Sequence, residues 1–189
     1  MASKNAVILH GTGDRPDDFW FPYLKSNLED RDYSVWLPQL PNAEKPNLKD
    51  WLSFVFEHGV ISKNTILIGH SAGAQLILSI LEKIDCQVAQ AILVSGYAEA
   101  LPNTAENPER NKLDWDNMKP HFKDIVFINS NNDPWGCTDV QGRIMLERLG
   151  GTQVICYDEG HMGSTTHKQP YKEFPLLIKL ISDSPSPAA

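Results

Sequence analysis

Hydrophobic and polar positions alternate along this chain in blocks that predict strands and helices in turn. Short apolar runs rich in β-branched residues predict six buried strands, at residues 6–9, 33–37, 65–68, 91–95, 125–130 and 152–157. Between them, apolar residues recur at helical spacing. The clearest helix follows Asn47, a suitable N-cap, because Leu48, Trp51, Leu52 and Val55 would share one face. Further helices are predicted at residues 16–30, from Ala72 onward, at 140–149 and at 171–181.

Strands that alternate with helices are typical of a parallel sheet, because parallel strands need long crossover connections. We therefore expect an α/β fold, with a doubly wound, mostly parallel six-stranded sheet and helices on both faces. One domain would span residues 1–182, and residues 183–189, rich in Ser and Pro, would form a disordered tail. The long polar stretch 96–121 predicts a reduced cap over an open site.

Residues 65–73, TILIGHSAG, join a β-branched run to an apolar helix through a G-x-S-x-G turn. Such a turn is typical of a nucleophile elbow, in which a strained serine projects its Oγ above the sheet. Gly69 and Gly73 would leave the space that the tight turn needs. The alternative is that Ser71 only caps the following helix, as serine often does.

A nucleophilic serine needs a histidine base and a carboxylate that orients it, which α/β-hydrolases supply in the order Ser, Asp or Glu, His. Asp133 follows the predicted strand at 125–130 in an Asn-rich turn, so we expect it to be the acid. His161 follows the last predicted strand in a glycine-flanked loop, so we expect it to be the base.

Other residues are also candidates for the acid and the base. Asp158 also follows a strand, but it lies only three residues from His161, too close to sit on a separate loop. An Asp-Pro pair is also ordinary turn chemistry. Among the other histidines, His70 would point away from the elbow, and His167 is the serious rival as base.

A glycine-rich loop, HGTG at residues 10–13, follows the first predicted strand. It could turn a backbone N–H toward the elbow, so we expect the amides of Thr12 and Ala72 to form an oxyanion hole. A phosphate-binding loop is the competing interpretation of these glycines, but neither G-x-x-x-x-G-K-[ST] nor G-x-G-x-x-G is present.

The composition and net charge of the chain exclude some classes of binding partner. The chain has 189 residues, a net charge of −7 and scattered Lys and Arg, so neither nucleic acid nor a membrane surface is an expected partner. No segment predicts export or a membrane span. Three distant cysteines lack metal-binding spacing, so we expect no metal, no cofactor and a reducing cytoplasm. Cys137 lies four residues after Asp133, so it could lie near the site, although core packing is the default explanation of a buried cysteine.

Five segments together resemble a known family: HGTG, ILIGHSAG, AILVSGY, FINSNNDPW and EGHMG. They resemble the small serine hydrolases grouped with retinoblastoma-binding protein 9, over about residues 6–181. The resemblance implies a compact α/β-hydrolase with a Ser71, Asp133 and His161 triad and esterase-like activity on small substrates. The L-x-C-x-E string associated with retinoblastoma binding is absent, since residues 56–60 read FEHGV, so that partner is not expected.

The expected reaction is therefore hydrolysis of a small acyl ester or amide through an acyl-enzyme on Ser71. Aromatic and sulfur side chains near the predicted triad in sequence, Trp20, Trp135 and Met162, are candidates for substrate binding, although core packing explains each of them equally well. A protein of the same fold that binds a ligand or partner without turnover is the alternative, because fold alone does not establish catalysis.

Overall fold

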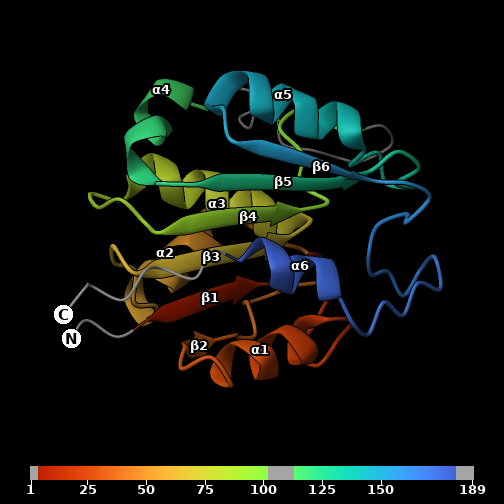
Figure 1. The fold of residues 1–189 in the computed structure, drawn as a ribbon, viewed down its shortest axis with the longest axis horizontal. Coiled ribbons are helices and arrows are strands. Elements are labelled where there is room, and N and C mark those ends of the chain that lie inside the picture. The colour runs from red at the N-terminus through yellow and green to blue at the C-terminus, as the bar shows by residue number, and fades with distance from the viewer. Residues whose placement is uncertain (1–3, 102–112, 182–189) are drawn as a thin grey trace.

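A computed structural model describes residues 4–101 and 113–181. Six strands form one sheet in which every neighbouring pair is parallel (Figure 1). In chain order the strands are β1 (Asn5–Leu9), β2 (Ser34–Trp36), β3 (Thr65–His70), β4 (Gln90–Val94), β5 (Ile125–Ser130) and β6 (Thr152–Cys156).

Helices connect these strands. They are α1 (Phe21–Glu29), α2 (Leu48–His58), α3 (Ala72–Lys83), α4 (Trp115–Met118), α5 (Asp139–Leu149) and α6 (Pro175–Leu180), with a short 3₁₀ turn, η2 (Lys119–His121), after α4. Within the two described ranges, no helix combines the length and the apolar character that a membrane crossing requires.

The strand order is β2-β1-β3-β4-β5-β6, so the chain winds outward from β1 to β2, returns to β3, and then winds outward in the other direction. This doubly wound order reverses between β1 and β3. Ligands of such sheets bind beyond the carboxyl ends of the strands, at the point of reversal. The loop that follows β1 and the turn that contains Ser71 lie at this point.

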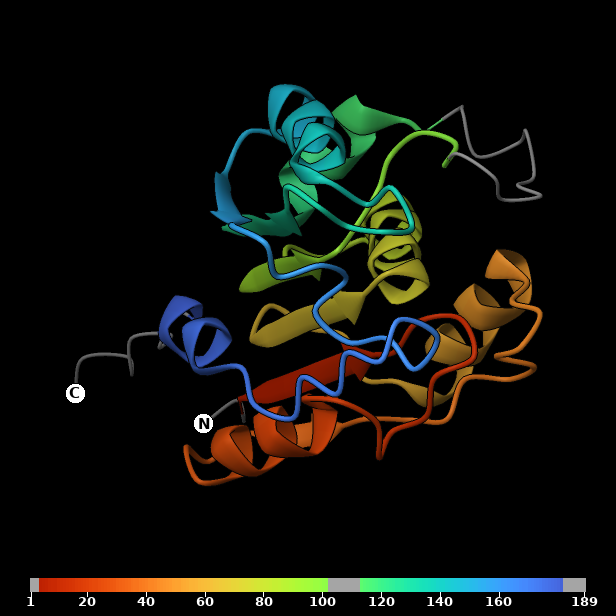
Figure 2. The same cartoon turned by 90° about the vertical axis from the view of Figure 1, so that its right-hand side faces the viewer.

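Helices cover both faces of the sheet, as predicted. Figure 2 places α1 and α6 on one side of the strands and α2, α3 and α5 on the other. Successive strand residues alternate between the two cores. In β1, Val7 and Leu9 pack with the α2, α3 and α5 side, whereas Ala6 and Ile8 pack with the α1 and α6 side. Because both faces are buried, the central strands are apolar along their length.

The predicted strands are all present, with ends that differ by at most two residues. Two helices are shorter than predicted. Residues 16–20 precede α1 in an irregular loop, and α1 begins next to a proline, which suits the first helical turn. The helix predicted at 171–181 begins only at Pro175, after Tyr171 adopts a left-handed φ of 37°. Part of the predicted cap, residues 102–112, and the tail at 183–189 lie outside the described residues.

Candidate active site

Ser71 sits in a strained turn between β3 and α3. Its φ of 53° and ψ of −117° lie in a region that residues with a side chain rarely adopt. The backbone is anchored on both sides, since Ser71 N–H donates to the Val94 carbonyl at 2.9 Å and the Ser71 carbonyl accepts from Ala74 N–H at 2.9 Å. The Ser71 side chain makes no capping hydrogen bond to α3. The capping role weighed from the sequence is therefore not observed.

The two elbow glycines are required by backbone contacts. A Cβ atom at Gly69 would lie 2.5 Å from the Gly73 carbonyl oxygen, and a Cβ atom at Gly73 would overlap the Leu9 carbonyl oxygen. Neither neighbour is a flexible side chain. The close packing of β3, α3 and β1 at the elbow therefore depends on glycine at both positions.

Asp133 and His161 form a buried hydrogen-bonded pair. His161 Nδ1 lies 2.7 Å from Asp133 Oδ2, and both residues are buried. The other carboxylate oxygen, Oδ1, accepts the Trp135 N–H at 2.8 Å, so the carboxylate is fixed through both oxygens. Because a carboxylate accepts, Nδ1 carries the proton and Nε2 is left as the basic nitrogen.

Burial sets the basicity of this imidazole. Desolvation lowers the pKa of His161 below its ordinary value of 6.5, and the hydrogen bond that His161 donates to Asp133 opposes that effect only in part. His161 is therefore neutral at neutral pH. A neutral imidazole whose Nδ1 proton is held by a carboxylate is the form that accepts a proton at Nε2.

The two rivals considered from the sequence make different contacts. Asp158 is exposed, and both its backbone and its carboxylate bond to Asn131 rather than to a histidine. His167 is exposed and packs edge-on against the Trp135 ring at 4.9 Å. Of the candidates, Asp133 and His161 are the pair that the fold brings together.

The turn that contains Asp133 and the loop that contains His161 are joined by hydrogen bonds that sequence reasoning did not find. Three polar side chains before Asp133 each accept a backbone N–H from the histidine loop: Asn131 from Asp158 at 2.7 Å, Ser130 from Glu159 at 3.1 Å and Asn132 from Gly160 at 2.8 Å. Together with the Asp133 and His161 pair, these bonds hold residues 130–133 against residues 158–161. The Ser-Asn-Asn run before Asp133 was the available sequence signal.

The loop predicted to supply an oxyanion donor lies against the elbow. A Cβ atom at Gly11 would lie 3.1 Å from the Ser71 Cβ and 3.4 Å from the His70 carbonyl oxygen. Gly11 N–H donates to Asp14 Oδ2 at 3.0 Å, so this amide is already occupied. Thr12 is exposed, and Ala72 is the buried first residue of α3.

Burial favours core packing, the alternative given above, for two of the three predicted substrate-binding side chains. Trp20 and Met162 have no exposed surface, so neither forms the wall of an open pocket. Trp20 instead donates its indole N–H to the Met162 carbonyl at 2.9 Å, which is a core contact. Trp135 is 39% exposed, and its ring centroid lies 6.4 Å from that of His161. Trp135 is the one of the three with surface to offer a substrate.

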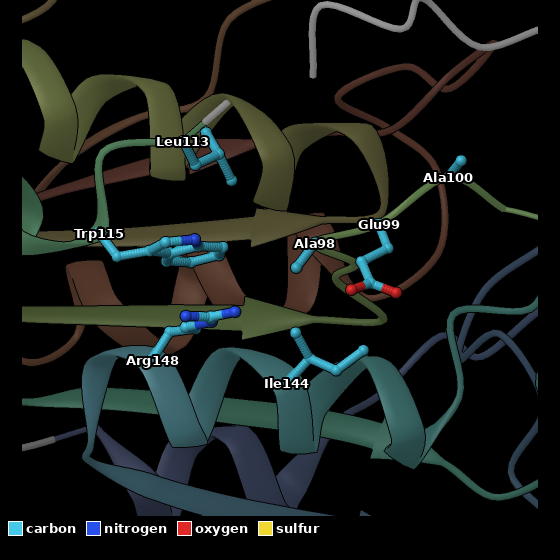
Figure 3. Close-up of a pocket in the computed structure, with 7 residues that line it drawn as sticks. All are labelled: Ala98, Glu99, Ala100, Leu113, Trp115, Ile144 and Arg148. Atoms are coloured by element: carbon cyan, nitrogen blue, oxygen red, sulfur yellow. The ribbon is translucent and has the colours of Figure 1, made fainter. Parts of the chain in front are cut away.

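A cavity of about 340 Å³ lies elsewhere, between α5 and the chain that follows β4 (Figure 3). Trp115 and Arg148 stand side by side at one end, and Glu99 lies toward the other. Its lining comprises Ala98, Glu99, Ala100, Leu113, Trp115, Ile144 and Arg148. Ser71, Asp133 and His161 are not part of this lining, so the cavity is separate from the candidate triad.

Cys137 lies beside the acid and the base. Its Sγ, a carboxylate oxygen of Asp133 and a ring nitrogen of His161 lie within 4.8 Å of one another, and all three residues are buried. Two ligands on one tetrahedral zinc would stand about 3.3 Å apart. The 2.7 Å between Asp133 Oδ2 and His161 Nδ1 is instead a hydrogen-bond distance. The donor set therefore fits an acid and base pair better than a metal centre.

A family model described as serine hydrolase matches residues 6–182. The chain belongs to the serine hydrolase family. Rat serine hydrolase RBBP9 (Rattus norvegicus) is 26% identical over 195 aligned positions that cover all of both chains. The YdeN protein of Bacillus subtilis strain 168 is 33% identical over 121 residues, which are 62% of this chain and 63% of YdeN. The matched part is thus less than two thirds of YdeN's length.

Solved structures confirm the fold of this serine hydrolase. The crystal structure of the ydeN gene product from B. subtilis superposes with a TM-score of 0.85 at 24% identity, covering 94% of this chain and 96% of that one. Mouse alpha/beta hydrolase domain-containing protein 10 superposes with a TM-score of 0.66 at 12% identity, covering 95% and 89%. The expected compact α/β-hydrolase fold and the expected resemblance are therefore confirmed, and the protein is a hydrolase.

Proposed function

We propose that this serine hydrolase cleaves small acyl esters or amides through an acyl-enzyme formed on Ser71. The observation that carries the proposal is the buried hydrogen bond of 2.7 Å between His161 Nδ1 and Asp133 Oδ2. It commits the imidazole to the tautomer in which Nε2 can accept a proton. The strained elbow supports the proposal as well, because it keeps the Ser71 hydroxyl out of helix capping.

In the proposed mechanism, His161 Nε2 takes the Ser71 proton as Oγ attacks the substrate carbonyl carbon. The carbonyl π electrons move to oxygen, and the Thr12 and Ala72 amides stabilise the resulting oxyanion. Asp133 holds the imidazolium that forms. The tetrahedral intermediate then collapses, the leaving group departs with the proton from His161, and Ser71 retains the acyl group. Water, deprotonated by His161, attacks this ester, and His161 returns the proton to Ser71 Oγ as the bond to the acyl carbon breaks and the acid leaves.

The proposed setting of this reaction is a single domain over residues 1–182 in a reducing cytoplasm. Cys86, Cys137 and Cys156 form no disulfide with one another, which supports a reducing compartment. The proposed substrate is a small molecule that contacts the exposed face of Trp135.

Ser71→Ala tests the proposal directly. We expect the variant to lower kcat on a p-nitrophenyl acyl ester on the order of 10⁶-fold, because the nucleophile itself is removed. A fluorophosphonate probe should label the wild-type protein at Ser71 and leave Ser71→Ala unlabelled. An inactive wild-type protein that the probe leaves unlabelled would instead indicate a fold that binds a ligand without turnover. A Ser71→Ala variant as active as wild type would exclude Ser71 as the nucleophile. A panel of short-chain esters, aminoacyl amides and acyl thioesters then ranks the acyl groups.

A further inference from the structure

The backbone of the proposed base is held by side chains from distant parts of the chain. The His161 carbonyl oxygen accepts two buried hydrogen bonds, one from His70 Nε2 at 2.9 Å and one from Ser95 Oγ at 2.9 Å. His70 is the last residue of β3, and Ser95 follows β4 directly. On the other side, His161 N–H donates to Gln169 Oε1 at 2.9 Å. The position of His161 therefore depends on contacts at both of its peptide groups.

The contact with the His161 carbonyl shows which nitrogen of the His70 ring carries a proton. A carbonyl oxygen can only accept, so His70 Nε2 carries a proton and donates it to His161. The opposite nitrogen, Nδ1, faces Asp14 Oδ2 at 3.4 Å. The His70 side chain is only 1% exposed. Four rings surround it: those of Phe19, Trp20 and Phe21 at centroid distances of 5.8–6.2 Å, and that of His161 at 4.8 Å. The ring is therefore closely confined between Asp14 and the His161 carbonyl.

Asp14 also reaches the loop proposed to bind the oxyanion. The same carboxylate oxygen that faces His70 accepts the Gly11 N–H at 3.0 Å. A single carboxylate therefore links the loop after β1 to the end of β3, and His70 continues the link to His161. This chain of contacts connects the proposed oxyanion loop to the proposed base without passing through Asp133.

The histidine loop needs such anchors because its backbone is strained. Met162, which follows His161, has a φ of 51°, and Ser95, which donates to the His161 carbonyl, has a φ of 47°. Left-handed backbone at residues with side chains is strained and persists only where surrounding contacts enforce it. The two bonds to the His161 carbonyl are such contacts.

We propose that His70 and Ser95 are positioning residues that hold His161 by its backbone carbonyl, and that Asp14 orients His70 while restraining the oxyanion loop. The inference rests on the proposed function of His161 as the base. It assigns no reacting atom to the three residues. Their effect is on where the imidazole stands relative to Ser71 and Asp133.

Variants at the two donors separate positioning from general stability. His70→Phe keeps an aromatic ring and removes the donor, whereas His70→Gln keeps an N–H near the position of Nε2. Ser95→Ala removes one buried hydroxyl. Ser79→Ala is its matched control, because Ser79 is also buried and donates to a backbone carbonyl, that of Gln75, within α3 and away from the site.

We expect His70→Phe and Ser95→Ala to lower kcat on a p-nitrophenyl ester about 10²-fold with little change in KM, since a misplaced catalytic group costs about that much. His70→Gln should recover most of the loss, and Ser79→Ala should match the wild type. The downfield proton NMR signal of His161 Nδ1–H can be assigned by its loss in Asp133→Asn. This signal should broaden in His70→Phe and Ser95→Ala and stay sharp in His70→Gln and Ser79→Ala.

The kcat and the NMR signal of His161 together distinguish a failure of the positioning role from a failure of the proposed function. Folded His70→Phe and Ser95→Ala proteins with wild-type kcat and an unchanged His161 signal would overturn the positioning role. Equal losses in Ser95→Ala and Ser79→Ala would overturn it too, because the effect would then be general. A wild-type protein that neither turns over esters nor binds the fluorophosphonate, but whose His161 signal responds as expected, would remove the proposed function and retain the positioning role.

Discussion

Asn132 accepts the Gly160 N–H at 2.8 Å and so ties the turn before Asp133 to the loop that carries His161. Its Oδ1 also accepts the Ser130 hydroxyl at 2.7 Å, so one amide oxygen organises both segments. The pairing of Asp133 with His161 is the end of this series of bonds rather than an isolated contact.

Asn132→Ala should therefore weaken the site. We expect a loss of about 1–3 kcal/mol in the free energy of unfolding, because Gly160 N–H and Ser130 lose their acceptor. The kcat on esters should fall as well. Asn132→Asp supplies acceptor oxygens and is the matched control. Chemical denaturation and ester kinetics measure both effects, and equal results for the two variants would contradict the role of the acceptor.

Asp133→Asn should lower kcat on the order of 10⁴-fold. An asparagine can present its amide N–H to His161 Nδ1, which would place the imidazole proton on Nε2, the nitrogen that must accept from Ser71. The fold should persist, because the variant keeps the size of the side chain. Steady-state kinetics with a circular dichroism control tests this, and activity close to wild type would argue against Asp133 as the acid.

Activity should rise with pH through a midpoint below 6.5. The active form of His161 is the neutral one, and burial lowers the pKa of this imidazole, so the protonated form appears only at lower pH than for an exposed histidine. Asp133 raises that pKa, so the residual activity of Asp133→Asn should titrate at still lower pH. The pH dependence of kcat/KM measures both midpoints. A wild-type midpoint above 6.5 would contradict the burial argument.

Gly73→Ala should cost more than about 3 kcal/mol of folding free energy, because the added methyl meets the backbone of β1 and that backbone cannot move aside cheaply. Gly150→Asn is the contrast, since Gly150 has a φ of 75° and a ψ of −155°, which strain any side chain, but no atom lies within 4 Å of an added Cβ, so its loss comes from backbone strain without overlap. Thermal unfolding of the two variants gives the comparison. A Gly73→Ala protein as stable as Gly150→Asn would mean that the elbow can open.

Trp135→Ala should raise KM several-fold and leave kcat for small esters nearly unchanged. The indole is 39% exposed beside His161, so it offers surface to a bound substrate without touching the reacting atoms. Trp135→Phe should keep most of the affinity. Michaelis kinetics on esters of increasing acyl size would show the effect growing with size if Trp135 contacts the acyl group.

The sequence predicted the sheet and the proposed acid and base because each depends on local patterns. A β-branched run followed by a turn marks a strand end, and Asp133 and His161 both stand at such ends. The contacts of His70 could not be predicted in this way. Its partners, Asp14 and the His161 carbonyl, lie 56 and 91 residues away, and no periodicity records them.

The sequence pattern also did not predict which of the candidate substrate-binding residues are buried. Trp20, Trp135 and Met162 look equivalent as apolar residues near the predicted triad, yet only Trp135 reaches the surface. The difference arises from tertiary packing, since Trp20 and Met162 meet across 142 residues of chain. Sequence alone places such residues near a site but does not determine which of them reach solvent.

All six strands run in the same direction, and the first and last elements meet at the end of the sheet away from Ser71. Asn5 opens β1 there, and the Leu180 carbonyl accepts a hydrogen bond from Gln90, the first residue of β4. A protein attached to a solid support through side chains near Asn5 or Leu180 would therefore present the elbow outward. Immobilised reactors and surface-based substrate screens can use such an attachment without obstructing the serine.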